Sequence, residues 1–242
     1  MKILITSGGT EEPLDGVRYI TNFSTGRTGA GLAEYLAVQG NDIVLLHGYH
    51  AVLPGTVAKE SVENGTIETI RYRTFSDLDA QLQKTLETDR DINIVIHLAA
   101  ISDYTPETIE TPDGNTFPAG GQGKISSGSK TMIVRFRRNY KILSRIREYT
   151  QGRDIILIGF KLTNTLDPGE KMAAIQKILQ DKTCDLLVHN DLNEIGKLPD
   201  NMHHDAAIYS ANGDPVSHTQ TKQQLFEQLY THICQLDRRL HT

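Results

Sequence analysis

The sequence predicts an α/β protein with a Rossmann-like, mostly parallel, doubly wound sheet and helices on both faces of that sheet. Strand-like apolar runs alternate with helical patterns through most of the 242 residues, as in proteins built on a parallel sheet. Several of the runs are continuously apolar, as expected for strands that helices cover on both sides. The loop after the first run is rich in Gly, Ser and Thr and leads into a helix, which is the layout of a phosphate site.

Local patterns place the elements along the chain. The expected strands are residues 2–6, 42–47, 66–73, 92–98, 131–137, 154–160, 185–189, 206–210 and 215–218. The expected helices are residues 29–39, 76–88, 139–149, 168–182 and 221–240. Residues 48–65 and 192–205 are expected to be irregular. Ser76 and Asn139 are expected to cap their helices, Pro168 suits a first helical turn, and Asn212-Gly213 suits a hairpin turn.

One stretch departs from this alternation. Residues 105–130 show almost no periodicity and contain several prolines and a run rich in glycine. A structureless connection of this length inside a compact domain is usually a lid, a binding loop or disorder. We therefore expect a single nucleotide-binding domain, residues 1–242, with a mobile lid segment at residues 105–130.

The composition excludes several classes of protein. The net charge of −5 offers no basic surface for nucleic acid. No apolar stretch approaches the ~20 residues that span a bilayer, and the N-terminus runs straight into the first strand without a signal peptide. Cys184 and Cys234 lack metal-like neighbours, which is typical of free thiols in a cytoplasmic protein. We expect neither a nucleic acid nor a membrane as a partner.

The predicted topology gathers polar residues at one edge of the sheet, because ligands of such sheets bind at the carboxyl ends of the strands. The loop 7–29 and residues 99–103, 160–161 and 190–191 all follow strand ends. The sequence offers no Ser in a nucleophile elbow, no cysteine beside a strand-end His and no convincing metal-ligand cluster. The remaining amide, hydroxyl, backbone N–H and Lys groups suit electrostatic stabilisation of a phosphate or an acyl phosphate.

Each candidate side chain has a functional and a structural interpretation. Asn22 could hold a carboxylate or an activated acyl carbonyl, or only shape a turn. Lys124 could close on a polyphosphate, or stay solvated. Phe160 could lie against a nucleobase, or belong to the core. Asp103 could bind a substrate hydroxyl or amide, or cap a turn, and with Asp191 it could help to hold Mg²⁺.

Several stretches resemble the phosphopantothenoylcysteine synthetase (phosphopantothenate–cysteine ligase) family. They are residues 7–11, 17–18, 20–29, 99–104, 123–128, 159–160 and 186–191, in the family's order. Together they span most of residues 1–210, and the first of them is already quite specific.

The resemblance implies a role for each matched residue. Asn22 and Lys124 would be catalytic, with Asn22 holding the acyl intermediate and Lys124 closing the lid over the reaction. Ala99, Ala100 and Asp103 would line the phosphopantothenate site together with Asn22. The nucleotide would be bound by Gly8, Ser24, Gly26, Gly29, Lys124, Phe160, Lys182 and Asn190. No residue is assigned to a metal.

The resemblance also implies the reaction, a step of coenzyme A biosynthesis. CTP or ATP would activate the carboxylate of 4′-phosphopantothenate to an acyl-nucleotidyl intermediate, with release of pyrophosphate. The amine of L-cysteine would then form the amide. Mg²⁺ would accompany the triphosphate. A homodimer is implied, because in this family the lid and part of the substrate site come from a second subunit.

Departures from the family pattern bear on the nucleotide and on the partners. Ser126 and Ser127 stand where the fused members have lysines, and residues 139–141 and His189 differ as well. CTP is favoured, and ATP stays open. The chain begins at the synthetase, so we expect a monofunctional bacterial enzyme with a separate decarboxylase as its pathway neighbour.

Two other functions stay open at this point. One is an NAD(P)-dependent oxidoreductase on a similar sheet, although the G-x-G-x-x-G and Tyr-x-x-x-Lys patterns are absent. The other is a non-catalytic regulator that keeps the ligand pocket, although Asn22 and Lys124 are both present.

Overall fold

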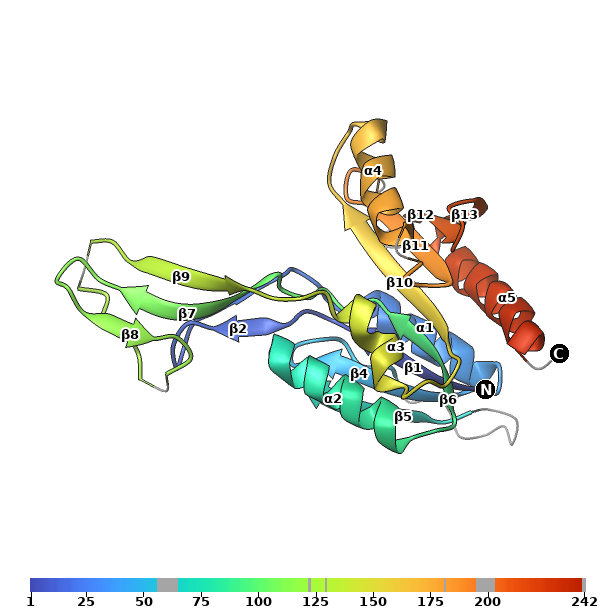
Figure 1. The fold of residues 1–242 in the computed structure, drawn as a ribbon, viewed down its shortest axis with the longest axis horizontal. Coiled ribbons are helices and arrows are strands. Elements are labelled where there is room, and N and C mark those ends of the chain that lie inside the picture. Colours follow the sequence, from blue (N-terminus) through green and yellow to red (C-terminus); the bar gives the residue numbers. More distant parts are fainter. Residues whose placement is uncertain (56–64, 122, 129, 181, 195–202, 241–242) are drawn as a thin grey trace.

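The computed structural model describes residues 1–55, 65–121, 123–128, 130–180, 182–194 and 203–240. Within them, the centre is an eight-stranded sheet of order β13-β12-β11-β10-β6-β1-β4-β5 (Figure 1). The strands from β11 to β5 in this order are parallel, and β12 and β13 are antiparallel. The bounds are β1 Lys2–Ser7, β4 Asp42–Gly48, β5 Ile67–Tyr72, β6 Ile92–His97, β10 Ile156–Thr163, β11 Leu186–Asp191, β12 His203–Ser210 and β13 Pro215–Thr221.

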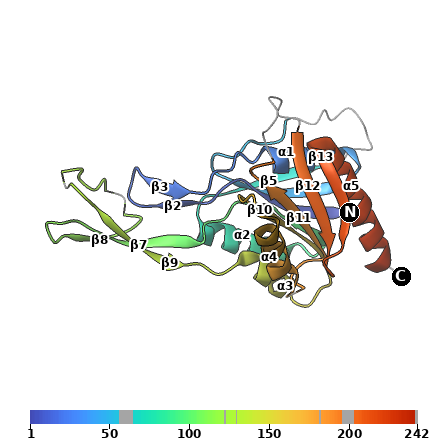
Figure 2. The ribbon, with the colours of Figure 1, turned by 90° about the horizontal axis from the view of Figure 1, so that it is seen from above.

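Helices cover both faces of this sheet, as the continuous apolar runs predict (Figure 2). Successive strand residues point to opposite faces, so Ile3 and Ile5 join one buried cluster and Leu4 joins the other. The first cluster is closed by α1 and α5, and the second by α2, α3 and α4. The bounds are α1 Arg27–Val38, α2 Phe75–Thr88, α3 Ile146–Tyr149, α4 Pro168–Leu179 and α5 Lys222–Leu240. The expected Rossmann-like α/β class is confirmed.

An arm of short strands projects from the carboxyl edge of the sheet (Figure 1). Three strands pair antiparallel in the order β8-β7-β9, and a hairpin of β2 and β3 accompanies them. The bounds are β2 Glu11–Pro13, β3 Tyr19–Thr21, β7 Tyr104–Glu110, β8 Thr116–Pro118 and β9 Ile133–Arg138. The expectation that residues 105–130 lack regular structure is therefore wrong for β7 and β8. Most side chains of the arm are exposed, so backbone pairing holds it without the buried stripe that reveals a strand in a sequence.

Several helix boundaries differ from their expected positions because other residues make the caps. α2 begins at Phe75, since Thr74 forms a reciprocal capping box with Asp77. Asn139 does not cap a helix, and a short 3₁₀ turn, Ile142–Arg145, precedes α3. α4 starts at Pro168 as expected and ends at Leu179.

The C-terminal hairpin and the free thiols match their predictions. β12 and β13 are joined by a turn in which Gly213 has a φ of 88°, and Cys184 and Cys234 are both unpaired. The expected irregular segments 48–65 and 192–205 fall partly outside the described residues, as does residue 181 of the expected helix 168–182. None of the described helices is long and apolar enough to cross a membrane.

Candidate active site

The loop after β1 is built around glycines that no other residue could replace without strain. Gly8 and Gly26 have φ values of 86° and 72°, which L side chains rarely adopt. A Cβ atom at Gly8 would lie 2.7 Å from the Cβ of Ala51, and one at Gly26 would lie 2.8 Å from the same atom. The Ser7 hydroxyl donates to the Gly26 carbonyl oxygen at 3.0 Å. The loop is therefore held close against the carboxyl ends of β1 and β4.

Gly29 brings the start of α1 onto the end of β1. A Cβ atom there would lie 2.5 Å from the Ser7 Cβ and closer still to the Ser7 hydroxyl oxygen. Gly26 supplies no capping side chain, and the first turn of α1 has no acidic residue. Backbone N–H groups at a helix start carry partial positive charge and suit a phosphate. Half-buried Ser24 lies in the same loop.

A second segment, residues 99–103 after β6, lies directly against this loop. The Ala100 N–H donates to the Gly8 carbonyl oxygen at 2.8 Å. The Asn22 side-chain amide donates to the Ile101 carbonyl oxygen at 2.7 Å, and the Ala99 N–H donates to the Thr6 hydroxyl at 3.2 Å. The structure thus brings Asn22, Ala99 and Ala100 together with the glycine loop, as the sequence predicts.

Asp103 stands at the rim of this group, and its partner is a residue that sequence reasoning did not single out. Its carboxylate pairs with the Lys141 ammonium at 2.5 Å, and both side chains are more than half exposed. The Asn139 side chain donates to the Ser102 carbonyl oxygen at 3.0 Å, and its N–H donates to the Asp103 carbonyl oxygen at 2.8 Å. In the sequence, residues 139–141 differ from the family pattern, which marks the position but indicates no role for it.

Phe160 and Asn190 lie on neighbouring parallel strands and on the same face of the sheet. Phe160 pairs with Val188, and Asn190 follows two residues later on β11. Phe160 is half-buried and packs on the cluster beneath α1 and α5. Asn190 is buried, and its amide donates to the Asp205 carbonyl oxygen at 2.8 Å. Each therefore has a structural task that does not depend on a ligand.

Two predicted nucleotide ligands do not join this group. Lys124 lies on the arm, where its neighbours bond to the tip of the β2–β3 hairpin. Four residues of extended chain, about 13 Å, separate Arg18 at that tip from Asn22. Lys182 precedes β11 and so lies at the amino edge of the sheet, opposite the loops described above. Its φ of 46° and an N–H bond to the Leu179 carbonyl oxygen end α4.

Two buried titratable groups at the carboxyl edge are held in fixed charge states. Burial lowers the pKa of His97 to about 4, so its ring is neutral at pH 7 and bonds to the Thr6 hydroxyl at 3.0 Å. Burial alone would raise the pKa of Asp191, but hydrogen bonds from Thr163, Asn193 and Thr165 hold it well below its usual range.

The candidate Mg²⁺ ligands are committed to protein partners. Both oxygens of Asp191 accept hydrogen bonds from the protein, and Asp103 is paired. In the described part of the chain, no three His, Cys, Asp or Glu side chains are grouped to hold a metal. This donor set fits a cation that arrives with substrate phosphates, as Mg²⁺ commonly does.

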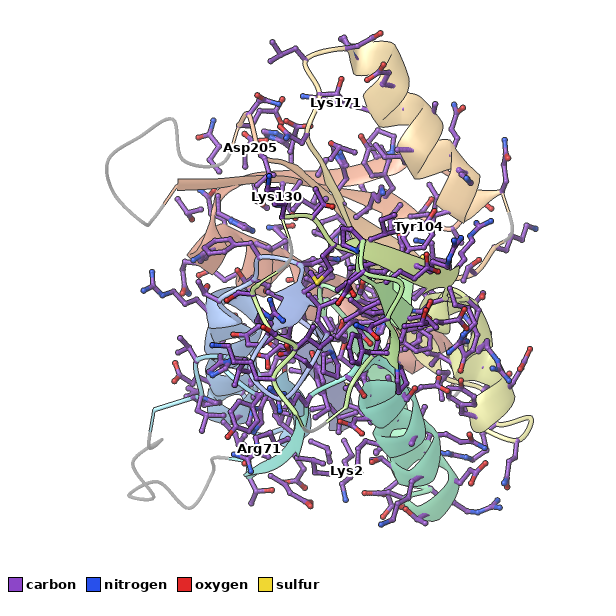
Figure 3. The ribbon with its side chains drawn as sticks, turned by 90° about the vertical axis from the view of Figure 1, so that its left-hand side faces the viewer. Lys2, Arg71, Tyr104, Lys130, Lys171 and Asp205 are labelled. Atoms are coloured by element: carbon purple, nitrogen blue, oxygen red, sulfur yellow. The ribbon has the colours of Figure 1, made fainter. Side chains whose placement is uncertain are left out.

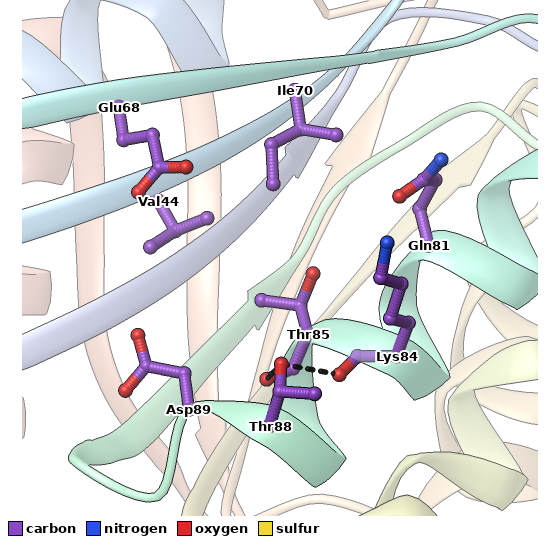
Figure 4. Close-up of a pocket in the computed structure, with 8 residues that line it drawn as sticks. All are labelled: Val44, Glu68, Ile70, Gln81, Lys84, Thr85, Thr88 and Asp89. Carbon is purple, nitrogen blue, oxygen red and sulfur yellow. Dashed lines mark hydrogen bonds between the residues drawn. The ribbon is translucent and has the colours of Figure 1, made fainter.

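Figure 3 looks along the arm toward the sheet and shows how charged side chains flank it. Lys171 of α4 and Asp205 of β12 lie on one side of the arm, and Arg71 of β5 lies on the other. A separate open pocket of about 260 Å³ lies between β5 and α2 (Figure 4). Its lining residues are Val44, Glu68, Ile70, Gln81, Lys84, Thr85, Thr88 and Asp89. It includes none of the predicted site residues.

The fold and these contacts define a Rossmann-like α/β protein with a candidate phosphate-binding edge and a projecting arm. Its family follows from comparison with known proteins. A model of the DNA/pantothenate metabolism flavoprotein C-terminal domain matches residues 1–236. The chain belongs to this family.

Solved structures agree with this assignment. The DNA/pantothenate metabolism flavoprotein from Streptococcus pneumoniae is 30% identical, with a TM-score of 0.79 over 98% of this chain and 99% of that one. A Cab2 mutant in complex with phosphopantothenate-cysteine has a TM-score of 0.72 over 100% of this chain and 89% of that one. At 19% identity, the Cab2 structure shows a shared fold.

Curated relatives are longer proteins. The coenzyme A biosynthesis bifunctional protein CoaBC of Methanocaldococcus jannaschii is 30% identical over 193 residues, which are 80% of this chain and 41% of that protein. CoaBC of Mycolicibacterium smegmatis is 28% identical over 216 residues, which are 88% of this chain and 47% of that protein. The chain thus spans less than half the length of these relatives. None of them supports the oxidoreductase alternative.

Proposed function

We propose that this protein is a phosphopantothenate–cysteine ligase of coenzyme A biosynthesis. It uses CTP, or ATP, to activate 4′-phosphopantothenate and then joins the acyl group to L-cysteine. Membership of the family supports the pathway, and the names of the CoaBC relatives and the ligand of the Cab2 structure fit this reaction. We place the reaction in the cytoplasm.

The observation that carries the proposal is the junction of the glycine loop with residues 99–103. The Asn22 amide bonds to Ile101 O at 2.7 Å, and Ala100 N–H bonds to Gly8 O at 2.8 Å. The uncharged Asn22 amide is thereby fixed against residues 99–103, and it lies in the same loop that leads into α1. Preorganised hydrogen-bond donors of this kind stabilise an acyl phosphate, and the Asp103 carboxylate at the rim is paired with Lys141.

Each group then has a defined task. Gly8, Ser24, Gly26 and Gly29 belong to the loop and helix start that receive the phosphate chain of the nucleotide in this proposal. Ala99, Ala100 and Asp103 line the phosphopantothenate site, and Asn22 holds the acyl intermediate. Phe160 and Asn190 face the base or sugar, and Lys141 joins Asp103 at the rim.

Lys124 serves the site of a second copy of the chain in this proposal. It lies at the far end of the β2–β3 hairpin, away from Asn22 of its own chain. The arm exposes Tyr19, Ile20, Ile133 and Phe136, apolar surface that a homodimer would cover. A partner arm would bring its lysine to the open edge as a compact positive charge for the polyphosphate.

In this proposal the nucleotide enters as its Mg²⁺ complex, since Mg²⁺ commonly binds through substrate phosphates. When bound, Mg²⁺ supplies charge neutralisation at the triphosphate. Lys182 lies at the opposite edge and has no part in this site.

The test is release of pyrophosphate by the purified protein with Mg²⁺, 4′-phosphopantothenate and L-cysteine, with CTP and ATP in parallel. We expect release that requires both nucleotide and phosphopantothenate, with CTP the better substrate. A protein that releases no pyrophosphate with either nucleotide would refute the proposal, and faster turnover with ATP would refute only the choice of base.

A further inference from the structure

The turn between β2 and β3 is organised by one nearly buried carboxylate. The Asp15 side chain is only 1% exposed, although the arm around it is largely open. Its Oδ1 accepts hydrogen bonds from the N–H of Val17 at 3.0 Å and of Arg18 at 2.9 Å. These two bonds build the turn.

The second oxygen of Asp15 reaches across to the segment that carries Lys124. Oδ2 accepts from Arg18 Nε at 3.0 Å and from the N–H of Ile125 at 3.1 Å. The same guanidinium donates through Nη2 to the Ile125 carbonyl oxygen at 3.2 Å. The Asp15–Arg18 pair therefore holds both backbone groups of the residue that follows Lys124.

Backbone bonds secure the other flank. The Gly16 N–H donates to the Gly123 carbonyl oxygen at 3.4 Å, and the Gly120 N–H donates to the Leu14 carbonyl oxygen at 3.1 Å. Lys124 itself is exposed, and no described residue forms an ion pair or hydrogen bond with its ammonium group. The segment is thus fixed at its backbone while its charge is left available.

We propose that Asp15 is the positioning residue for Lys124, holding it at a set place on the hairpin so that its charge reaches the reacting phosphates without an ordering step. The inference rests on the proposed function for the role of Lys124, but not for the pinning itself. Hydrogen bonds from Arg18 hold the pKa of Asp15 well below its usual range, so the carboxylate is ionised at any neutral pH. Preorganisation of this kind matters because a misplacement of about 1 Å can cost about 100-fold in rate.

The first experiment measures the pinning without reference to activity. Trypsin cleaves after Lys124 only when the backbone at Ile125 leaves Asp15. Asp15→Asn keeps the size of the side chain but turns an amide donor toward Arg18 and Ile125. We expect cleavage after Lys124, relative to cleavage after Lys130, to rise about tenfold in this variant.

Asp113→Asn is the matched control, since it makes the same change in another turn of the same arm, where Asp113 accepts from Asn115. We expect its cleavage ratio to equal that of the wild type. An equal ratio in Asp15→Asn would overturn the proposal. Amide hydrogen exchange of the wild-type protein tests the same contact and does not depend on a variant that folds. The Ile125 N–H should exchange at least about tenfold more slowly than the Lys124 N–H, and equal exchange rates would also overturn the proposal.

The second experiment is a double-mutant cycle on kcat with Lys124→Gln. If Asp15 acts through Lys124, Asp15→Asn lowers kcat about 10- to 100-fold alone and has less than about a twofold effect when Lys124 is already Gln. A general structural role would give the same factor in both backgrounds, which would overturn the proposal. A wild-type protein without turnover would refute the proposed function. Proteolysis and amide exchange would still show whether Asp15 holds the backbone beside Lys124.

Discussion

Gly29→Ala is the substitution for which the structure gives the sharpest expectation. Gly29 lies in the first turn of α1, and a Cβ there would come within 2.5 Å of Ser7 Cβ. Ser7 ends the central strand β1, which pairs on both sides and cannot retreat. Overpacking of this kind costs about 1–3 kcal/mol, whereas replacing a helical Gly by Ala returns at most about 1 kcal/mol. We expect a net loss of about 1–2 kcal/mol in the free energy of unfolding.

Gly31→Ala is its matched control in the same helix. A Cβ at Gly31 would meet only the buried ring of Phe226, at 3.2 Å, a milder overlap that a shift of a few tenths of an ångström relieves. The helical gain and the tight contact there roughly cancel, so we expect a change below about 0.5 kcal/mol.

Urea unfolding measures both stabilities, and pyrophosphate release measures the nucleotide KM of each variant. A loss of 1–2 kcal/mol would lower Tm by about 2–8 °C in a chain of this size. Gly29→Ala should also raise the nucleotide KM, since α1 must shift from β1, and Gly31→Ala should not. If Gly29→Ala were as stable as Gly31→Ala with an unchanged KM, the close approach of α1 to β1 would be irrelevant to both folding and binding.

Three further predictions address the site and the fold. Asn22→Asp replaces the amide that donates to Ile101 with a carboxylate beside an anionic intermediate, and we expect kcat to fall about 100-fold. The control, Asn212→Asp in the β12–β13 turn, should leave kcat unchanged. Equal kcat values for the two variants would show that Asn22 does not hold the intermediate. Thr74→Ala removes the capping box of α2 and should lower the free energy of unfolding, measured in urea, by about 1 kcal/mol. An unchanged free energy of unfolding would mean that packing alone fixes the start of the helix. Burial lowers the pKa of His97 to about 4 in the folded protein, against about 6.5 in the unfolded chain. Between pH 6.5 and pH 4 the unfolded chain therefore binds more protons than the folded one, and the free energy of unfolding falls as the pH drops through this range. His97 accounts for a loss of about 2 kcal/mol in the free energy of unfolding between pH 7 and pH 5. In His97→Gln, urea unfolding at the two pH values should show a loss smaller by that amount. An unchanged loss would show that His97 is not held neutral in the folded protein.

The sheet could be predicted because strands that are buried on both faces have continuously apolar sequences. The strands at residues 42–47 and 92–98 are continuously apolar, and both appear within a residue of their expected bounds. The glycine loop could be predicted as a backbone feature, and Gly8 and Gly26 indeed have positive φ. The role of Gly29 could not, because its close approach to Ser7 depends on how α1 docks.

The arm was predicted only in part. The strand expected at residues 131–137 is confirmed as β9, but β7 and β8 pair through their backbones, and no continuous buried face imposed a period on their residues. The Asp103–Lys141 pair was also out of reach, because it depends on the contact of two loops that are 38 residues apart. Lys182 was assigned to the nucleotide through the family resemblance, although it precedes the expected strand 185–189 and therefore lies at the amino edge of the sheet.

The central claim is that a nucleotide-activated acid is held at the carboxyl edge of this sheet before cysteine reacts. A single-turnover experiment without cysteine tests it most directly, with Mg²⁺, CTP and 4′-phosphopantothenate mixed with an excess of enzyme. The account predicts a stoichiometric burst of pyrophosphate and an acyl-nucleotidyl species in the mass spectrum, which later cysteine converts to the amide. No pyrophosphate until cysteine is present, with no acyl-nucleotidyl species at any time, would contradict it.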